Sequence, residues 1–159
     1  MNLKVKIKKL VNDAVIPTYS KEGDAGMDLV ATSKSYDEDG NIVYGTGLAF
    51  EIPKGCVGLL FPRSSNAKKD LLLSNSVGVL DSGYRGEVML KFKPSGVHKI
   101  NYNRNYGFEA DFKSELENYN ISDKVGQIII LPYPQIEFEE SEELSESERN
   151  TGGFGSTGK

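Results

Sequence analysis

Two reactive residue types are nearly absent from this 159-residue chain, which has one cysteine, Cys56, and one histidine, His98. A single cysteine cannot form an intrachain disulfide, which fits a reducing, cytoplasmic compartment. A single histidine can build neither a histidine-based metal site nor a catalytic triad by itself. Any chemistry must therefore rest on carboxylates, hydroxyls, amides and arginines.

Long apolar runs are also missing. No run approaches the roughly 20 residues that span a bilayer, so a membrane protein is not expected. The formal net charge of −4 argues against a general nucleic-acid binder, which would usually be basic. A phosphate ligand would instead be held by local arginines and backbone amides. With 38% hydrophobic and 26% charged residues, the composition is that of one ordinary globular domain.

Short apolar or alternating segments between glycine and proline breaks predict a β-rich fold. In the segment 87–93, Val88, Leu90 and Phe92 recur with the period of two that marks a half-buried strand. The apolar run at 128–131, ended by a proline, predicts a strand buried on both faces. The predicted strands span residues 3–7, 47–53, 57–61, 87–93 and 128–131. Many short strands separated by turns predict a sandwich, jelly roll or barrel.

The remaining segments are less regular. Residues 62–71 carry a serine cap candidate at a predicted helix start, and residues 113–119 are a weaker helix candidate. Residues 94–123 read as a long loop or small insertion. We expect a body at 1–136, an acidic solvated linker at 137–148 and a glycine-rich tail at 149–159.

Three segments could carry chemistry, and each also has a plain structural interpretation. The first places Asp24 and Asp28 around a glycine, as a turn leading into a strand or as an oxygen ligand for a hydrated divalent cation. The second, Pro-Arg-Ser-Ser at 62–65, is a capped helix start or a phosphate clamp built on Arg63. Neither segment by itself distinguishes the structural from the functional interpretation.

The third segment, at 78–87, contains Asp-Ser-Gly at 81–83, which suits the turn of a hairpin between strands at 77–80 and 87–92. Such a hairpin offers unpaired backbone groups that can imitate the pairing partner of a nucleobase. Asp81 at its edge could orient and deprotonate an attacking water. Tyr84 would supply a flat surface beneath a sugar.

The order of these segments is more specific than any one of them. Asp-Ala-Gly-x-Asp-Leu, Pro-Arg-Ser-Ser, Gly-Val-Leu-Asp-x-x-Tyr-Arg-Gly, Gly-Gln-Ile-Ile and Gly-Gly-Phe-Gly-Ser-Thr-Gly follow one another between residues 24 and 158. This series resembles the five ordered motifs of the trimeric dUTPase family. The resemblance implies an all-β jelly roll, or β-clip barrel, with one short helix, assembled as a homotrimer with shared active sites.

The resemblance also implies the reaction, which is hydrolysis of dUTP to dUMP and pyrophosphate by water attack on the α-phosphorus. This activity limits uracil incorporation into DNA and supplies dUMP for dTMP synthesis. By the same resemblance, Asp81 positions the nucleophilic water, Asp28 holds Mg²⁺ through water, and Tyr84 packs against deoxyribose. The tail at 149–159 matches a lid that closes over the substrate, with Phe154 over the uracil. The residues that match substrate-binding positions are Arg63, Ser64, Ser65, Asn75, Gly78, Val79, Leu80, Tyr84, Gln127, Arg149, Phe154, Gly155, Ser156 and Thr157.

Other interpretations remain open at this point. A dCTP deaminase shares the fold and the nucleotide class, but its family typically lacks the Asp-x-x-Tyr segment and the Phe-Gly-Ser-Thr lid. A catalytically silent nucleotide-binding or regulatory protein on the same fold is a second alternative. The insertion at 94–123 is longer than the usual connection between the third and fourth motifs. It is either a surface appendage for regulation or partner binding, or a well-packed decorative loop.

Overall fold

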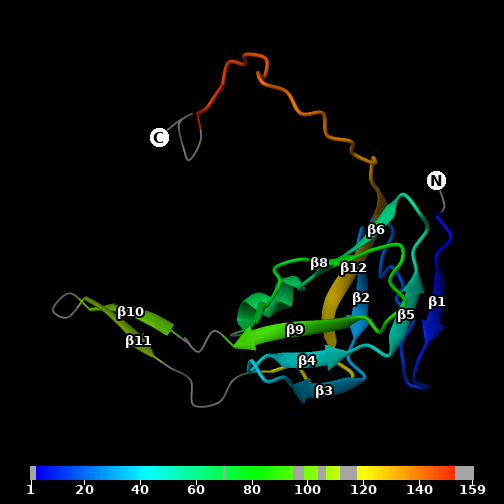
Figure 1. The fold of residues 1–159 in the computed structure, drawn as a ribbon. Helices are drawn as coiled ribbons and strands as arrows, with labels where there is room; N and C mark the ends of the chain where they lie inside the picture. Colours follow the sequence, from blue (N-terminus) through cyan, green and yellow to red (C-terminus); the bar gives the residue numbers. More distant parts are fainter. Residues whose placement is uncertain (1–2, 70, 95–98, 104–106, 112–117, 153–159) are drawn as a thin grey trace.

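The computed structural model describes residues 3–69, 71–94, 99–103, 107–111 and 118–152. Nearly all of its regular structure is β, in agreement with the predicted fold class (Figure 1). The strands are β1 (Lys6–Lys9), β2 (Met27–Val30), β3 (Ser33–Tyr36), β4 (Ile42–Gly45), β5 (Leu48–Glu51), β6 (Cys56–Phe61), β7 (Leu71–Leu73), β8 (Gly78–Leu80), β9 (Met89–Pro94), β10 (Lys99–Asn103), β11 (Gly107–Asp111) and β12 (Lys124–Pro132). Within this part of the chain, no helix is long and apolar enough to cross a membrane.

Two four-stranded antiparallel sheets form the body. Their strand orders are β2-β12-β6-β8 and β3-β4-β9-β7, and a smaller sheet pairs β1 with β5. Alternating side chains from these strands meet in one core, as expected of a sheet protein with one solvated face per sheet. In β9 and the residue before it, Val88, Leu90 and Phe92 are buried while Met89 and Lys91 are exposed. The predicted alternation of this segment is therefore confirmed.

An aromatic cluster closes one side of the core. The rings of Tyr44 and Phe92 lie 5.9 Å apart and those of Tyr44 and Tyr119 lie 5.8 Å apart, both edge to face. The Tyr44 hydroxyl donates to the backbone carbonyl of Tyr119 at 3.0 Å and accepts from the backbone N–H of the same residue at 3.1 Å. The segment that returns from the 94–123 insertion is thereby fixed to the centre of β4.

Several sequence predictions need correction. Residues 77–80 and 87–92 do not form a hairpin, because β8 pairs with β6 while β9 pairs with β4 and β7. Their buried residues belong to different sheets, and the turn between them crosses from one sheet to the other. The predicted helix at 62–71 is a short 3₁₀ helix, η1 (Ser64–Lys68). Its N-cap is Arg63, whose side chain makes no capping hydrogen bond.

Two other segments differ in detail. The apolar run of β12 was expected to be buried on both faces, but Ile128 is fully buried while Leu131 is 36% exposed. The predicted strand at 3–7 begins later, as β1, although Val5 and Ile7 do pack against the core. Cys56 is buried at the start of β6.

The 94–123 insertion contains a β-hairpin, where a loop or small insertion was predicted. β10 and β11 pair antiparallel, from Lys99 with Asp111 to Asn103 with Gly107. Among the described strands they pair only with each other, and Figure 1 shows the hairpin beyond the end of β9. His98 and most of the helix candidate at 113–119 lie outside the described residues.

Candidate active site

A pocket of about 390 Å³ opens beside the loop between β7 and β8. This volume lies within the usual range for small-molecule sites. The predicted catalytic residue Asp81 and five predicted substrate-binding residues line it: Asn75, Gly78, Val79, Leu80 and Tyr84. The structure therefore brings together the residues of the third motif, although they do not form the predicted hairpin. The other lining residues are Leu60, Leu73, Ser74, Glu87, Val88, Met89, Leu90 and Lys91.

The position of β8 explains why this pocket can offer backbone groups to a ligand. β8 is the last strand of its sheet in the part of the chain that the structure describes, so one of its edges faces away from β6. A Cβ on Gly78 would lie 3.0 Å from Cβ of Leu60, which means that glycine lets β8 pack closely on β6. An open strand edge presents fixed donors and acceptors, the kind of surface that can distinguish one base edge from another.

The turn after β8 determines the positions of Asp81 and Tyr84 at the pocket. The backbone N–H of Tyr84 donates to the Asp81 carbonyl at 3.1 Å, and Arg85 donates to the Ser82 carbonyl at 2.7 Å. The Tyr84 hydroxyl donates to the carbonyl of Glu87 at 3.1 Å, which fixes the ring at the pocket wall. Tyr84 remains 45% exposed and Asp81 is exposed. Both side chains are therefore accessible to a ligand in the pocket.

A second cluster gathers around Asp28. Arg63 donates from Nε to Oδ1 of Asp28 at 2.8 Å, and Lys124 Nζ lies 2.8 Å from Oδ2. Gln127 donates from Nε2 to Oδ1 at 3.4 Å. The Asp28 side chain is only 14% exposed. Burial by itself raises the pKa of Asp28, but the bonds from Lys124, Arg63 and Gln127 outweigh it and hold this pKa below its ordinary value.

Strand register explains this cluster. Gln127 of β12 pairs with Asp28 of β2 on one side and with Phe61, two residues before Arg63, on the other. The sequence interpretation missed Lys124, which lies three positions before Gln127 and so on the opposite face of a regular strand. A register shift between Lys124 and Gly126 turns both side chains toward Asp28. The one sequence feature that could have predicted this contact is the presence of a basic residue, Lys124, close to the fourth motif.

The serines of the second motif lie beside the same cluster. Arg63 donates from Nη1 to Oγ of Ser65 at 3.3 Å, so Ser65 helps to orient the guanidinium. Ser64 is exposed at the first position of η1. A guanidinium with an adjacent hydroxyl is a suitable arrangement for binding phosphate oxygens.

Asp28 is the residue predicted to hold Mg²⁺ through water, and its nearest polar neighbours are the hydrogen-bond donors Arg63, Lys124 and Gln127. No group of three or more His, Cys, Asp or Glu side chains capable of holding a metal occurs among the described residues. Magnesium keeps several waters and often takes its remaining oxygens from substrate phosphates. Both oxygens of the Asp28 carboxylate are bound by cationic side chains, so such an ion would take its direct ligands from water and substrate phosphates and not from Asp28.

The two clusters do not meet within one chain. Asp28, Gln127 and Phe61 lie side by side on β2, β12 and β6. On the next strand, Leu80 pairs with Gly58, so Asp81 lies opposite Val57, four residues along the strand direction from Phe61. Three interstrand spacings of about 4.8 Å and four residues of about 3.3 Å separate the backbones of Asp28 and Asp81 by roughly 20 Å. The Asp28 and Asp81 side chains are therefore too far apart to meet within one chain.

The C-terminal segment is described only as far as Gly152. Residues 133–148 are exposed, and Figure 1 shows the chain leaving the body after β12. Arg149 donates from Nε to the Gly152 carbonyl at 2.9 Å. The predicted lid residues Phe154, Gly155, Ser156 and Thr157 lie outside the described residues.

The fold and the pocket define a small all-β protein with a candidate ligand site at the edge of a sheet, lined by both apolar and polar residues. Comparison with known proteins gives the family, because the family model described as dUTPase matches residues 12–106. The deoxyuridine 5'-triphosphate nucleotidohydrolase of Clostridium acetobutylicum is 38% identical over 97% of this chain and 96% of its own length. That of Escherichia phage T5 is 35% identical over 97% of this chain and 98% of its own length. The chain belongs to the dUTPase family.

Solved structures of dUTPases have the same fold as this chain. The dUTPase of Staphylococcus bacteriophage 80alpha with dUPNHPP superposes with a TM-score of 0.76 at 28% identity, covering 99% of both chains. A mutant dUTPase from phage phi11 of S. aureus, described with a structural Mg(II) ion, gives a TM-score of 0.67 at 26% identity. The match covers 89% of this chain and 98% of that chain.

Proposed function

We propose that this protein is a dUTP diphosphatase that hydrolyses dUTP to dUMP and pyrophosphate. The observation that carries the proposal is the pocket in which the open edge of β8 lies beside Asn75, Asp81 and Tyr84, in a chain of the dUTPase family. Such an activity limits uracil incorporation into DNA and supplies dUMP for dTMP synthesis. The single buried Cys56 supports the further prediction of a cytoplasmic, reducing environment.

In the proposed mechanism, the exposed Asp81 carboxylate orients a water and accepts one of its protons. The water oxygen attacks the α-phosphorus, the bond from this phosphorus to the bridging oxygen breaks, and pyrophosphate leaves. Backbone groups of Gly78, Val79 and Leu80 read the uracil edge together with the Asn75 amide. The ring of Tyr84 packs against deoxyribose and leaves no room for a 2′-hydroxyl.

The phosphates require charge stabilisation more than covalent chemistry. Arg63, Ser64, Ser65 and Gln127 would bind phosphate oxygens, supported by their positions around Asp28. Asp28 would hold Mg²⁺ through water, and the ion would neutralise charge on the triphosphate. The tail at 149–159 is proposed to be the lid. In it, Phe154 covers the uracil, and Arg149, Gly155, Ser156 and Thr157 bind the outer phosphates.

A homotrimer with shared active sites would bring the two clusters together. The separation of Asp28 from Asp81 supports this assembly, since a second subunit can supply Arg63 beside the pocket of the first. The exposed residues at 137–148 support the domain division proposed from the sequence, with a body at 1–136 and a linker that carries the lid to another subunit. A groove of about 890 Å³, lined largely by apolar side chains, is a further surface for contacts between subunits.

The insertion at 94–123 is proposed to bind a regulatory partner. The support is the β10–β11 hairpin, which pairs with no other described strand of the body. Related phage dUTPases are described as controlling transfer of virulence genes, and the phage phi11 dUTPase as having a species-specific insert. Replacing residues 95–117 by a short bridge, which keeps the buried Tyr119 and its bonds to Tyr44, should leave assembly and turnover intact. Loss of the oligomer in that variant, measured by light scattering, would show that the insertion is structural.

Pyrophosphate release tests the main proposal. Wild-type protein should release pyrophosphate from dUTP in the presence of Mg²⁺, much less with EDTA, and little from dTTP, dCTP or UTP. Ammonia release from dCTP would favour a deaminase instead. Tight binding of dUpNHpp without any turnover of dUTP would favour a catalytically silent nucleotide-binding protein.

A further inference from the structure

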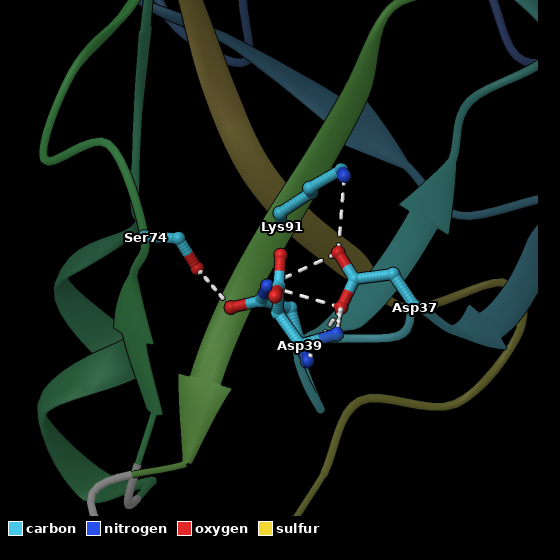
Figure 2. A network of polar contacts seen from close by, with 5 residues as sticks. Asp37, Asp39, Ser74 and Lys91 are labelled. Carbon is cyan, nitrogen blue, oxygen red and sulfur yellow. Dashed lines mark hydrogen bonds and ion pairs between the residues drawn. The ribbon is translucent and has the colours of Figure 1, made fainter.

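A chain of polar contacts crosses the exposed face of β9 (Figure 2), and Ser74 at one end of it lines the candidate pocket. Ser74 donates from its hydroxyl to Oδ1 of Asn41 at 2.8 Å. Asn41 donates from Nδ2 to both carboxylate oxygens of Asp37, each at 3.0 Å. Asp37, Asn41 and Ser74 are called the strap below. It joins the turn between β3 and β4 to the loop between β7 and β8, which are separated by 33 residues in sequence.

The strap fixes the orientation of the Asn41 amide. Both carboxylate oxygens of Asp37 accept from its NH₂ group, so its carbonyl oxygen faces the other way. That oxygen is an acceptor, and it can only be satisfied by a donor such as the Ser74 hydroxyl. Each contact therefore determines the direction of the next, from the carboxylate to the serine.

The Asp37 end of the strap is firmly held. Its Oδ1 accepts from the backbone N–H groups of Asp39 at 3.2 Å and Asn41 at 2.9 Å. Lys91 of β9 lies 3.0 Å from Oδ2. The ion pair with Lys91, assisted by the bonds from Asn41, lowers the pKa of Asp37 to about 2, so this carboxylate is ionised at neutral pH.

The Ser74 end enters the loop that carries Asn75. The Ser74 backbone N–H donates to the Lys91 carbonyl at 2.9 Å, so the residue is bonded through both its backbone and its side chain. Ser76, two residues further on, has a φ of 60°, which is unfavourable for a residue with a side chain. A loop with this conformation, exposed at residues 74–77, needs anchoring at its ends to remain in one arrangement.

We propose that the strap is a positioning device for base recognition, in which Asn41 and Ser74 hold the loop so that Asn75 faces the uracil edge. The proposal rests on the proposed dUTPase function. Ser74 and Lys91 line the same pocket as Asn75, so a shift of the loop changes the distance between the Asn75 amide and a base bound at β8. Discrimination between bases by hydrogen bonds requires correctly placed donors and acceptors, so displacing them lowers selectivity more than a comparable change in pocket shape.

The experiment compares Asn41→Ala, Ser74→Ala and the double variant with wild-type enzyme. Pyrophosphate release gives kcat and KM for dUTP and for dCTP, and thermal unfolding gives Tm. Each single variant should raise KM for dUTP and lower the dUTP-to-dCTP ratio of kcat/KM by about three- to tenfold, the effect of losing one oriented hydrogen bond. The double variant should be no worse than either single one, because the strap acts as a unit.

Two further variants make the test specific. Ser74→Thr keeps the hydroxyl and should restore both KM and the selectivity ratio. Glu38→Ala alters an exposed acidic residue of the same turn while leaving the strap residues in place, and it should behave as wild type. Wild-type selectivity in Ser74→Ala would overturn the proposal. So would a lower Tm with an unchanged ratio, or additive losses in the double variant.

If the wild-type protein itself fails to hydrolyse dUTP, the proposed function is wrong and the strap proposal falls with it. If the wild type turns over dUTP while all strap variants keep its selectivity, only the strap proposal is wrong.

Discussion

Replacing Tyr44 with phenylalanine tests how the insertion is attached to the body. The Tyr44 hydroxyl serves both backbone groups of Tyr119, accepting from the N–H at 3.1 Å and donating to the carbonyl at 3.0 Å. Tyr44 is fully buried and Tyr119 is 3% exposed, so water does not readily replace the hydroxyl. Phenylalanine keeps the ring and its edge-to-face contacts but leaves two buried backbone groups without this partner.

The magnitude follows from those two groups. An unsatisfied buried donor or acceptor costs about 1–3 kcal/mol, and removing the tyrosine hydroxyl from the core returns part of this cost. We expect Tyr44→Phe to lower the free energy of unfolding by about 2–4 kcal/mol. Because burial raises the pKa of Tyr44 to about 12, the hydroxyl stays protonated and the difference should be constant between about pH 6 and 9.

Urea unfolding followed by far-UV circular dichroism measures this difference. Wild type and variant must be compared at the same protomer concentration, since the proposed homotrimer would make stability depend on concentration. Tyr36→Phe is the matched control, because the same oxygen is removed from a side chain that is 66% exposed. It should change stability by less than about 0.5 kcal/mol. An equally small effect for Tyr44→Phe would refute the reasoning.

Three other predictions concern charged groups. Asp81→Asn should lower kcat for dUTP by about 10²- to 10⁴-fold, with binding of dUpNHpp retained by calorimetry, and near-normal turnover would remove Asp81 from the general-base role. Lys124→Gln should raise the pKa of Asp28, read by carboxyl NMR titration, because a cation 2.8 Å from Oδ2 is lost, and an unchanged pKa would contradict the ion pair. Asp37 has a folded pKa of about 2, below its ordinary value of 3.8, so its contribution to stability is complete above about pH 4 and is lost as the pH falls toward 2. Asp37→Asn should therefore lower Tm at pH 7, and its difference from wild type should shrink between pH 4 and 2.

Local patterns in the sequence determined much of the fold. The alternation of Val88, Leu90 and Phe92 predicted which side chains of β9 are buried, because period-two hydrophobicity reflects the geometry of a single strand. Cys56 and the segment at 57–61 likewise agree with β6. The ordered motifs indicated the family without any knowledge of the contacts between them. Each motif is a short, contiguous stretch of residues, so it can be recognised from the sequence alone.

The pairing of strands was not determined locally. A good turn sequence at 81–83 predicted that β8 and β9 form a hairpin, yet they belong to different sheets. Turn chemistry specifies that the chain reverses, whereas the burial of both strands decides which neighbours they take. The predicted serine cap failed for a similar reason, since Arg63 occupies the cap position and its side chain is bound to Asp28.

The contacts that complete the site were decided by tertiary structure alone. A register shift in β12 brings Lys124 to Asp28, which the regular alternation of a strand would forbid. Asn41 meets Ser74 only because β4 and β7 flank the same strand, β9. The sequence thus determined which side chains are available and what chemistry they carry. Their partners depend on sheet order and register, which arise from burial summed over many residues distant in the chain.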